Sequence, residues 1–470
     1  MKYIKIFLSV LVVIALSTGC QDRLDINTDP LVASTADPNV LLPFVLVQYS
    51  NRHTTELGTR IMDVPQHFSA CFNSPRAGNT SSFLTGNTWD MYYTRVLGNL
   101  VLVENDAVAQ GELSNNVNAI AKILKAKSFF ELACIWDAVP FTEALDGAAF
   151  PTPNFDEQEV VFRGAVDLLD QAIGLIDATP ESGSFDVTTG DLIFEGDMDK
   201  WRRWANTLKL RILMLIRNKD TSVDSEIVAT LGQPLIEENS QAALLEYFDT
   251  PAESNGYNRL VEAFFGVSNE VQEVYAPGEV LYDLLSAGDP RFGLMIADPN
   301  DEGSPGNGQF AFSVGGATIA DNVIRNDIPH IMALPSEVHF YKAELALLGV
   351  TSDDAQAEFT MGVRKILEFW GQDIPGAQTR LSSEDISNFV DGLPTADLQA
   401  VQEQLYLESF LRPVYAWNTV RRTKVPALVP PPAANISFIL KRFNYPPDEV
   451  ASNPNAPVNL DTDTPVWFEN

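Results

Sequence analysis

Apolar residues recur at the spacing of an α-helix in six long stretches of this 470-residue chain. The six stretches are 117–136, 158–177, 200–217, 336–349, 355–370 and 397–411. In the first stretch the apolar pattern is broad enough for a helix that is buried on more than one side. Small residues in this stretch would let a neighbouring helix approach closely: Ala121, Ala126 and Ala133. We therefore expect a mainly-α fold in which successive helices pair as in tetratricopeptide repeats, although no repeat consensus is legible.

Long irregular stretches separate these helices: 66–88, 179–199, 250–275, 297–332 and 424–470. Loops of this length inside a compact body are usually functional. The last stretch is rich in proline, which cannot continue a helix, so it is expected to run as extended chain over the helical body. No linker rich in Pro, Gly and Ser and no block of charge divides the chain, so residues 20–470 are predicted to form one domain.

The N-terminus has the pattern of a secretory signal. Two lysines precede an apolar run over residues 6–16, which is too short to span a bilayer and is followed closely by Gly19 and Cys20. This arrangement is typical of a lipoprotein whose cysteine thiol is acylated, although serine stands where leucine is usual. We expect residues 1–19 to be a lipoprotein signal peptide, Cys20 to carry the lipid, and residues 20–35 to form a short tether. An ordinary secretory signal cut near Cys20 is the alternative.

The chain is strongly acidic, with 63 Asp and Glu against 31 Lys and Arg and a net charge of −32. Binding to phosphates requires clustered cations, so nucleic acid is excluded as a general partner. A charge of this sign suits a surface or periplasmic protein that binds neutral ligands. Cys71 and Cys134 could pair in an oxidising compartment, or Cys134 could be a buried free thiol in its apolar helix.

No catalytic signature is present. The four histidines form no His-Glu-x-x-His pair, and there is no Cys-x-x-Cys motif, Gly-x-Ser-x-Gly turn or phosphate-binding glycine loop. Among so many acids some carboxylate pair would resemble a glycosidase dyad by chance, and none stands out. We predict no catalytic residue, cofactor or metal site. Calcium stays open for acidic loops such as 298–303, where the ligand spacing is incomplete.

Several phrases along the chain together resemble the SusD/RagB family of nutrient-binding outer-membrane lipoproteins. The most specific is GDMDKWRRWANTLKLRI at 196–212. The others are LDINTDP at 24–30, WDAVPFTEAL at 136–145, PNFDEQEVVF at 153–162, GDPRF at 288–292, SEVHFYKAELALLG at 336–349, RRTKVPAL at 421–428 and KRFNYPPDE at 441–449. Their order spans nearly the whole mature chain. The resemblance implies a SusD-like helical body without enzymatic activity.

The resemblance also implies a partner, a SusC-like TonB-dependent transporter on which this protein would sit as a lid. It places the protein on the cell surface of a Gram-negative bacterium, with a lipid anchor in the outer membrane. The expected ligand is a nutrient, foremost an oligosaccharide or polysaccharide, although relatives also handle peptides. Two rival hypotheses are a surface glycoside hydrolase and a lipid-anchored helical-repeat scaffold that binds only proteins. Abundant loop aromatics argue against the scaffold.

Polar residues within the family phrases have structural interpretations. Asp156 is placed to cap the helix that follows it. Asn206 and Arg211 are expected to tie down neighbouring loops, while Arg421 and Arg422 are expected to form salt bridges with core-facing carboxylates. The ligand would then contact the irregular stretches between the phrases.

Three of those stretches combine aromatic rings, which stack on the apolar faces of sugars, with polar side chains that bond sugar hydroxyls. The candidate ligand-binding residues are Phe72, Asn73, Arg76, Phe83 and Trp89 in the first, Tyr257, Asn258 and Arg259 in the second, and Phe310 and Phe312 in the third. Trp89 stands beside Tyr92 and Tyr93 near a helix start, and at least one of these three rings is expected in the core.

Overall fold

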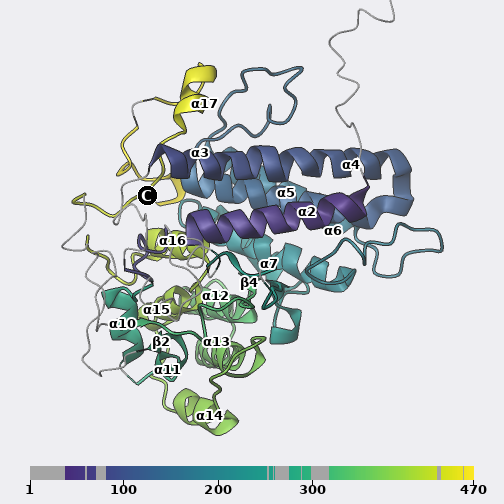
Figure 1. The fold of residues 1–470 in the computed structure, drawn as a ribbon. Coiled ribbons are helices and arrows are strands. Elements are labelled where there is room, and N and C mark those ends of the chain that lie inside the picture. Colours follow the sequence, from purple (N-terminus) through teal and green to yellow (C-terminus); the bar gives the residue numbers. More distant parts are fainter. Residues whose placement is uncertain are drawn as a thin grey trace, which may run out of the picture.

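The computed structural model describes residues 37–58, 61–69, 81–250, 253–257, 259, 275–286, 288–297, 317–430, 436–458 and 460–469, and the statements below concern these residues. Helices dominate them (Figure 1). The α-helices are α2 (Pro38–Arg52), α3 (Ser82–Asp90), α4 (Gly98–Gln110), α5 (Asn115–Trp136), α6 (Gln158–Leu175), α7 (Met198–Arg217), α8 (Asp224–Leu231), α10 (Glu279–Ser286), α11 (Phe292–Met295), α12 (Pro335–Leu347), α13 (Ala355–Glu368), α14 (Ser383–Asp391), α15 (Leu398–Glu408), α16 (Pro413–Thr423) and α17 (Pro447–Ser452). All six stretches predicted to be helical are helices, so the mainly-α prediction is confirmed.

Strands are few and short. β1 (Ala243–Leu245) pairs antiparallel with β4 (His330–Ala333), and β2 (Ile296–Ala297) pairs antiparallel with β3 (Thr318–Ile319). Both pairs join segments that are distant in the sequence. The backbone hydrogen bonds of the two strand pairs hold these segments together, and the strands form no layer of their own.

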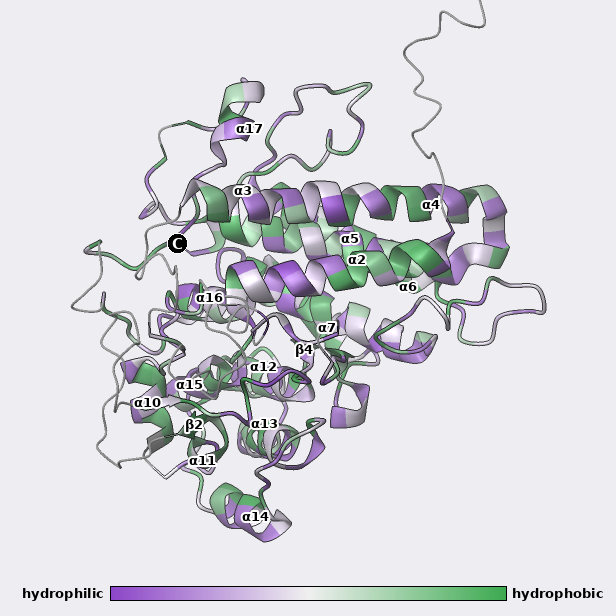
Figure 2. Cartoon of the chain, viewed as in Figure 1, coloured by the Kyte–Doolittle hydropathy of each residue, from purple (hydrophilic) through white to green (hydrophobic). Residues whose placement is uncertain are grey.

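Figure 1 shows α2, α4, α5 and α6 in one layer above α12, α13 and α15. α5 packs against both α4 and α6, α6 packs against α7, and α12 packs against α13 and α15. Consecutive helices therefore pair along the chain, as expected for tetratricopeptide-like units. At the rim, Figure 2 shows polar and apolar residues mixed within α14, and its Ile386 and Val390 are buried.

α7 joins the two layers because most of its residues are buried. It contacts α5 and β4, and its Trp201, Trp204 and Leu208 are buried. Asp197 caps its start, because the carboxylate accepts hydrogen bonds from the backbone N–H groups of Asp199 and Lys200 at 3.1 Å each. Residues 196–212, the sequence that most specifically resembles the family, therefore form the capped start and the buried body of α7.

Asn206 and Arg211, on the same helix, tie it to neighbouring segments. The Asn206 amide donates to the carbonyl of Pro234 at 2.9 Å, and the Arg211 guanidinium donates to the carbonyl of Met332 at 3.1 Å. The Asn206 contact agrees with the expected role of tying down a loop, whereas the partner of Arg211 lies in β4.

The two adjacent arginines of α16 differ in their partners. Arg422 forms the expected salt bridge, with Glu344 at 2.7 and 2.8 Å. Arg421 instead donates to the Cys134 carbonyl at 2.7 Å and to Asn418 Oδ1 at 2.6 Å, so its expected carboxylate partner was wrong. The thiol of Cys134 is free and buried, and burial raises its pKa to about 12. Cys71 lies outside the described residues.

Asp156 does not cap α6, contrary to expectation. Its carboxylate accepts hydrogen bonds from the backbone N–H groups of Phe141 and Thr142 at 3.0 and 2.8 Å. The N-cap of α6 is Glu157, whose side chain makes no capping hydrogen bond. The carboxylate is engaged by the turn that follows α5, because Val139 pairs with Asp156 in an isolated β-bridge.

The proline-rich C-terminal stretch contacts the helical body, as predicted, but it is not extended throughout, because it contains α17 and a 3-10 turn at Trp467–Glu469. The backbone N–H of Phe443 donates to the carbonyl of Ile135 at 2.9 Å, and the Tyr445 hydroxyl donates to the carbonyl of Ala138 at 2.6 Å. These bonds satisfy carbonyl groups at and just beyond the end of α5 that the helix itself leaves unpaired.

Buried histidines predict how stability depends on pH. His67 lies against Tyr406, whose carbonyl is 3.0 Å from the ring Nε2, and burial lowers the pKa of His67 from 6.5 to about 3. Burial also holds the pKa values of His53 and His330 well below 6.5. As pH falls from 6.5 towards 3, the unfolded chain binds protons that the folded protein does not, so stability should fall over this window.

We expect the melting temperature to fall between pH 7 and pH 4, and His67→Gln to reduce the slope. The glutamine amide can still donate to the Tyr406 carbonyl, but it does not titrate. Thermal melts at several pH values compare the two proteins. An identical slope in both would show that His67 contributes nothing to the pH dependence.

Candidate functional site

Segments that flank the predicted ligand loops meet at one place on the fold. The backbone N–H of Ser69 donates to the carbonyl of Ala276 at 2.8 Å, and Phe68 pairs with Pro277 in an isolated antiparallel bridge. The backbone N–H of Ile319 donates to the carbonyl of Tyr275 at 2.7 Å. Residues 61–69, 275–278 and 317–320 therefore lie side by side. We call these three segments the loop-anchor region.

A fourth segment reaches the same region. The Gln66 side chain donates to the carbonyl of Val429 at 2.5 Å, which brings the C-terminal stretch to the loop-anchor region. Close approach is also needed at Gly278, because a Cβ there would lie 2.0 Å from the carbonyl oxygen of Gln66. These contacts between distant segments were not predicted from the sequence. The Pro277–Gly278 pair is a turn signal that could have indicated one of them.

An aromatic cluster supports the loop-anchor region from inside. The rings of Phe68, Tyr257 and Tyr275 lie 5.4 to 6.2 Å apart by centroid. The Tyr275 hydroxyl donates to the Tyr257 carbonyl at 3.0 Å. Tyr257 is only 2% exposed. It was predicted to be a loop aromatic for stacking on a sugar, and its core position revises that interpretation.

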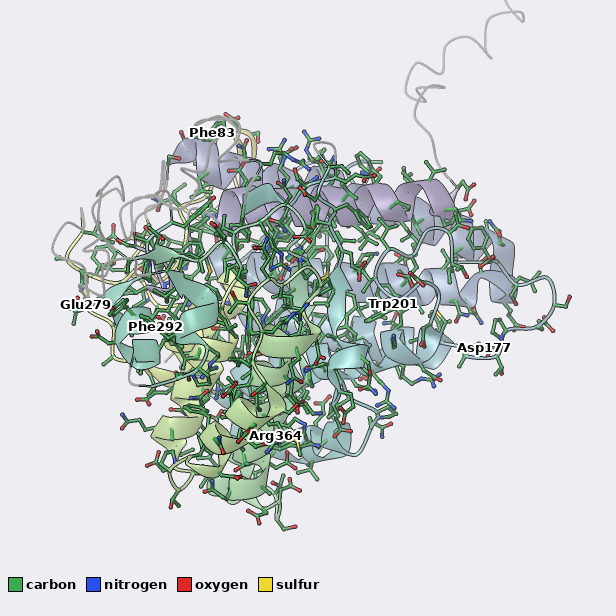
Figure 3. The ribbon with its side chains drawn as sticks, turned by 60° about the horizontal axis from the view of Figure 1, so that its bottom comes forward. Phe83, Asp177, Trp201, Glu279, Phe292 and Arg364 are labelled. Atoms are coloured by element: carbon green, nitrogen blue, oxygen red, sulfur yellow. The ribbon has the colours of Figure 1, made fainter. Side chains whose placement is uncertain are left out.

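Phe83 and Trp89, both predicted ligand contacts, differ in exposure. Phe83 is 60% exposed, and Figure 3 shows it at the edge of the molecule. Trp89 is partly buried, since its ring centroid lies 5.0 Å from that of Trp136 and 6.2 Å from that of Phe155. Of the neighbouring rings, Tyr92 is fully buried, as was expected for at least one of them. Phe83 is thus the better placed of the two candidates for a ligand.

Arg259 is partly buried and lines a surface cavity, and its guanidinium donates to the Ser254 carbonyl at 2.6 Å. The remaining predicted contacts lie outside the described residues: Phe72, Asn73, Arg76, Asn258, Phe310 and Phe312. The same holds for Cys20 and for the acidic segment 298–303 that left calcium open.

Buried acids near the helix contacts are engaged by cations. Glu344 pairs with Arg422, and Glu337 lies 2.7 Å from Arg211 and 3.1 Å from Arg412. In the part of the chain that the structure describes, no three His, Cys, Asp or Glu side chains are grouped so that they could hold a metal ion. No described helix is both long and apolar enough to cross a membrane.

Comparisons with known proteins give the family. Residues 33–446 match the SusD-like family described as "Starch-binding associating with outer membrane". No curated protein matches the chain. Among solved structures, a chitin-binding protein is 22% identical with a TM-score of 0.77, over 89% of this chain and 94% of its own. A Bacteroidetes SusD-like protein is 19% identical with a TM-score of 0.79, over 93% of this chain and 100% of its own.

A third structure, a chitin-binding SusD homologue from Flavobacterium johnsoniae, is 18% identical with a TM-score of 0.74, over 92% of this chain and 98% of its own. At these identities the structures establish a common fold. The family match covers most of the chain and nearly all the phrases on which the resemblance rested. The chain belongs to the SusD-like family.

Proposed function

We propose that this protein is a non-catalytic, lipid-anchored protein of the outer membrane that binds a carbohydrate and delivers it to a SusC-like TonB-dependent transporter. The observation that carries the proposal is the loop-anchor region, where the segments flanking three aromatic-rich stretches are hydrogen-bonded to one another. Rings and polar groups from separate stretches would thereby gather around one ligand. A site of that composition suits a sugar.

The comparisons support a neutral glycan as the ligand. The family is described as starch-binding, and two structural neighbours are named as chitin-binding. Starch and chitin are both uncharged polymers. An acidic protein with a net charge of −32 would repel an anionic polysaccharide and accept a neutral one.

The function is tested by incubating the purified full-length protein with insoluble starch and with chitin. We expect the protein to sediment with at least one polymer and to release no reducing ends during prolonged incubation. Turnover that persists through rigorous purification would favour the glycoside hydrolase alternative. A protein that binds neither these nor other polysaccharides, yet associates with other proteins, would favour the scaffold alternative.

Anchoring is tested at Cys20. Cys20→Ala should abolish metabolic labelling with palmitate and release the protein from outer-membrane fractions, because acyl chains on this residue would supply its durable contact with the bilayer. Cys134→Ala is the matched control, since that thiol is buried in α5, and it should leave labelling and fractionation unchanged. Unchanged membrane partitioning of the Cys20 variant would contradict the lipoprotein assignment.

A further inference from the structure

A cavity of about 790 Å³ opens between α2, the segment 188–195 and the segment 239–248 that contains β1. This volume lies within the range of small-ligand sites, roughly 300–1,000 Å³. None of the loop-anchor segments contributes to the described lining, although Arg259 does. The cavity is therefore a place on the fold distinct from the loop-anchor region.

Exposed apolar side chains border the cavity. Phe248 is 54% exposed, Leu192 is 40% exposed and Val47 is 37% exposed, and all three line it. They come from three separate parts of the chain, so the fold itself brings them together. An exposed ring in a cavity that aliphatic groups also line is a surface on which the apolar C–H face of a sugar can stack.

The side-chain amide of Asn51 also lines the cavity, and its oxygen is held by a hydrogen bond. The Tyr247 hydroxyl donates to Asn51 Oδ1 at 3.2 Å and also lies 2.6 Å from Ser50 Oγ. Because Oδ1 is held in this way, the Nδ2 group of Asn51 is left as a donor for a molecule in the cavity. Lys200 and Ser240 also line the cavity, and their side chains make no hydrogen bond or ion pair with the described residues.

The charges of the lining favour a neutral ligand. Glu195, Glu246 and Glu253 line the cavity against the cations Lys200 and Arg259. Asp191 also contributes, but its carboxylate is already used by several backbone N–H groups and by the indole of Trp201 at 2.7 Å. Excess negative charge disfavours phosphorylated or uronic-acid ligands.

We infer that this cavity is a second carbohydrate subsite, in which one neutral sugar unit stacks on Phe248 and bonds to Asn51. The inference rests on the proposed carbohydrate function and adds a contact away from the loop-anchor region. Two contacts on one glycan would raise the overall affinity through effective concentration, without a strong single site.

The test is hydrogen–deuterium exchange of the full-length protein titrated with maltoheptaose and, separately, with chitohexaose. We expect saturable protection of peptides covering 188–195 and 239–250, in addition to protection of the loop-anchor region. In Phe248→Ala, the sugar concentration for half protection of those two peptides should rise at least tenfold. Phe248→Tyr should restore it, because the ring is kept.

Two further variants guard against a folding defect. Leu192→Glu places a charged side chain on the exposed border and should reproduce the loss with an unchanged melting temperature. Phe150→Ala is the matched control, because Phe150 is 41% exposed and does not line the cavity. It should behave as the wild type does.

The outcomes separate the two claims. Protection that is confined to the loop-anchor region, or a Phe248→Ala protein that titrates as the wild type does, overturns the second subsite and leaves the proposed function standing. A wild-type protein that shows saturable binding of neither sugar contradicts the carbohydrate function and the subsite together.

Discussion

Replacing Glu337 with alanine should lower the free energy of unfolding by about 3–5 kcal/mol, the usual cost of breaking a buried ion pair. Glu337 lies on α12 and is fully buried. Its carboxylate is 2.7 Å from the Arg211 guanidinium on α7 and 3.1 Å from that of Arg412, which precedes α16. Without it, two buried cations would share one remaining acid, Glu408, which pairs with Arg412.

The side chains of Arg211, Glu337 and Arg412 are almost fully buried, so water would not replace the lost carboxylate. Both guanidinium groups lie over the ring of Tyr415, at 4.7 and 4.4 Å from its centroid. Burial and the neighbouring Glu337 carboxylate raise the pKa of Glu408 to about 7, although Arg412 opposes the rise. Glu408 already pairs with Arg412, so this single carboxylate cannot fully replace Glu337 for both arginines. The three helices α7, α12 and α16 would lose their common electrostatic contact.

Urea denaturation of Glu337→Ala measures the effect, with Glu159→Ala as the control. Glu159 pairs with Arg163 four residues along α6, and both side chains are exposed by about two-fifths. Exposed pairs contribute at most about 1 kcal/mol, so this variant should unfold close to the wild type. Equal losses in the two variants would show that the Arg211–Glu337–Arg412 cluster does not hold the helices together.

The helices could be predicted from the sequence because burial of an apolar face dictates their periodicity. Residues 117–136 and 200–217 are legible for this reason, and they became α5 and α7 with small shifts at the ends. Arg422 was also predictable, since a cation in a core helix needs an acid. Arg421, the residue before it, instead faces backbone carbonyls of other segments. No local sequence pattern distinguishes the surroundings of Arg421 from those of Arg422.

Other features depend on contacts between distant segments. Asp156 has the local pattern of a cap, but its neighbour across the bridge, Val139, decides its partners. Tyr257 has the composition of a ligand loop around it, yet it packs against Phe68 from another stretch and against Tyr275 at the far end of its own. The cavity beside Phe248 combines α2 with two segments that are far from it and from each other in the sequence, so no periodicity could have indicated it.

The central claim is that aromatic side chains of the irregular stretches, together with Phe83 at the start of α3, bind a carbohydrate. Removing a stacking ring costs about 1–3 kcal/mol when it is a hot spot, and weak monomeric binding would then fall below detection. We therefore expect Phe72→Ala, Phe83→Ala and Phe312→Ala to abolish the retardation of the protein by a polysaccharide in a gel, without a change in melting temperature. Trp204→Ala should do the reverse, because truncating this fully buried ring costs about 3–5 kcal/mol of stability.

Affinity electrophoresis in gels containing soluble starch or a soluble chitin derivative, with each variant beside the wild type, is the most direct measurement. Tyr257→Ala serves as an internal contrast, since its buried ring assigns it to the stability class with Trp204. The account predicts that the wild type is retarded and that the folded Phe72→Ala, Phe83→Ala and Phe312→Ala variants migrate as they do in gels without polysaccharide. Retardation of all three variants equal to that of the wild type would contradict it.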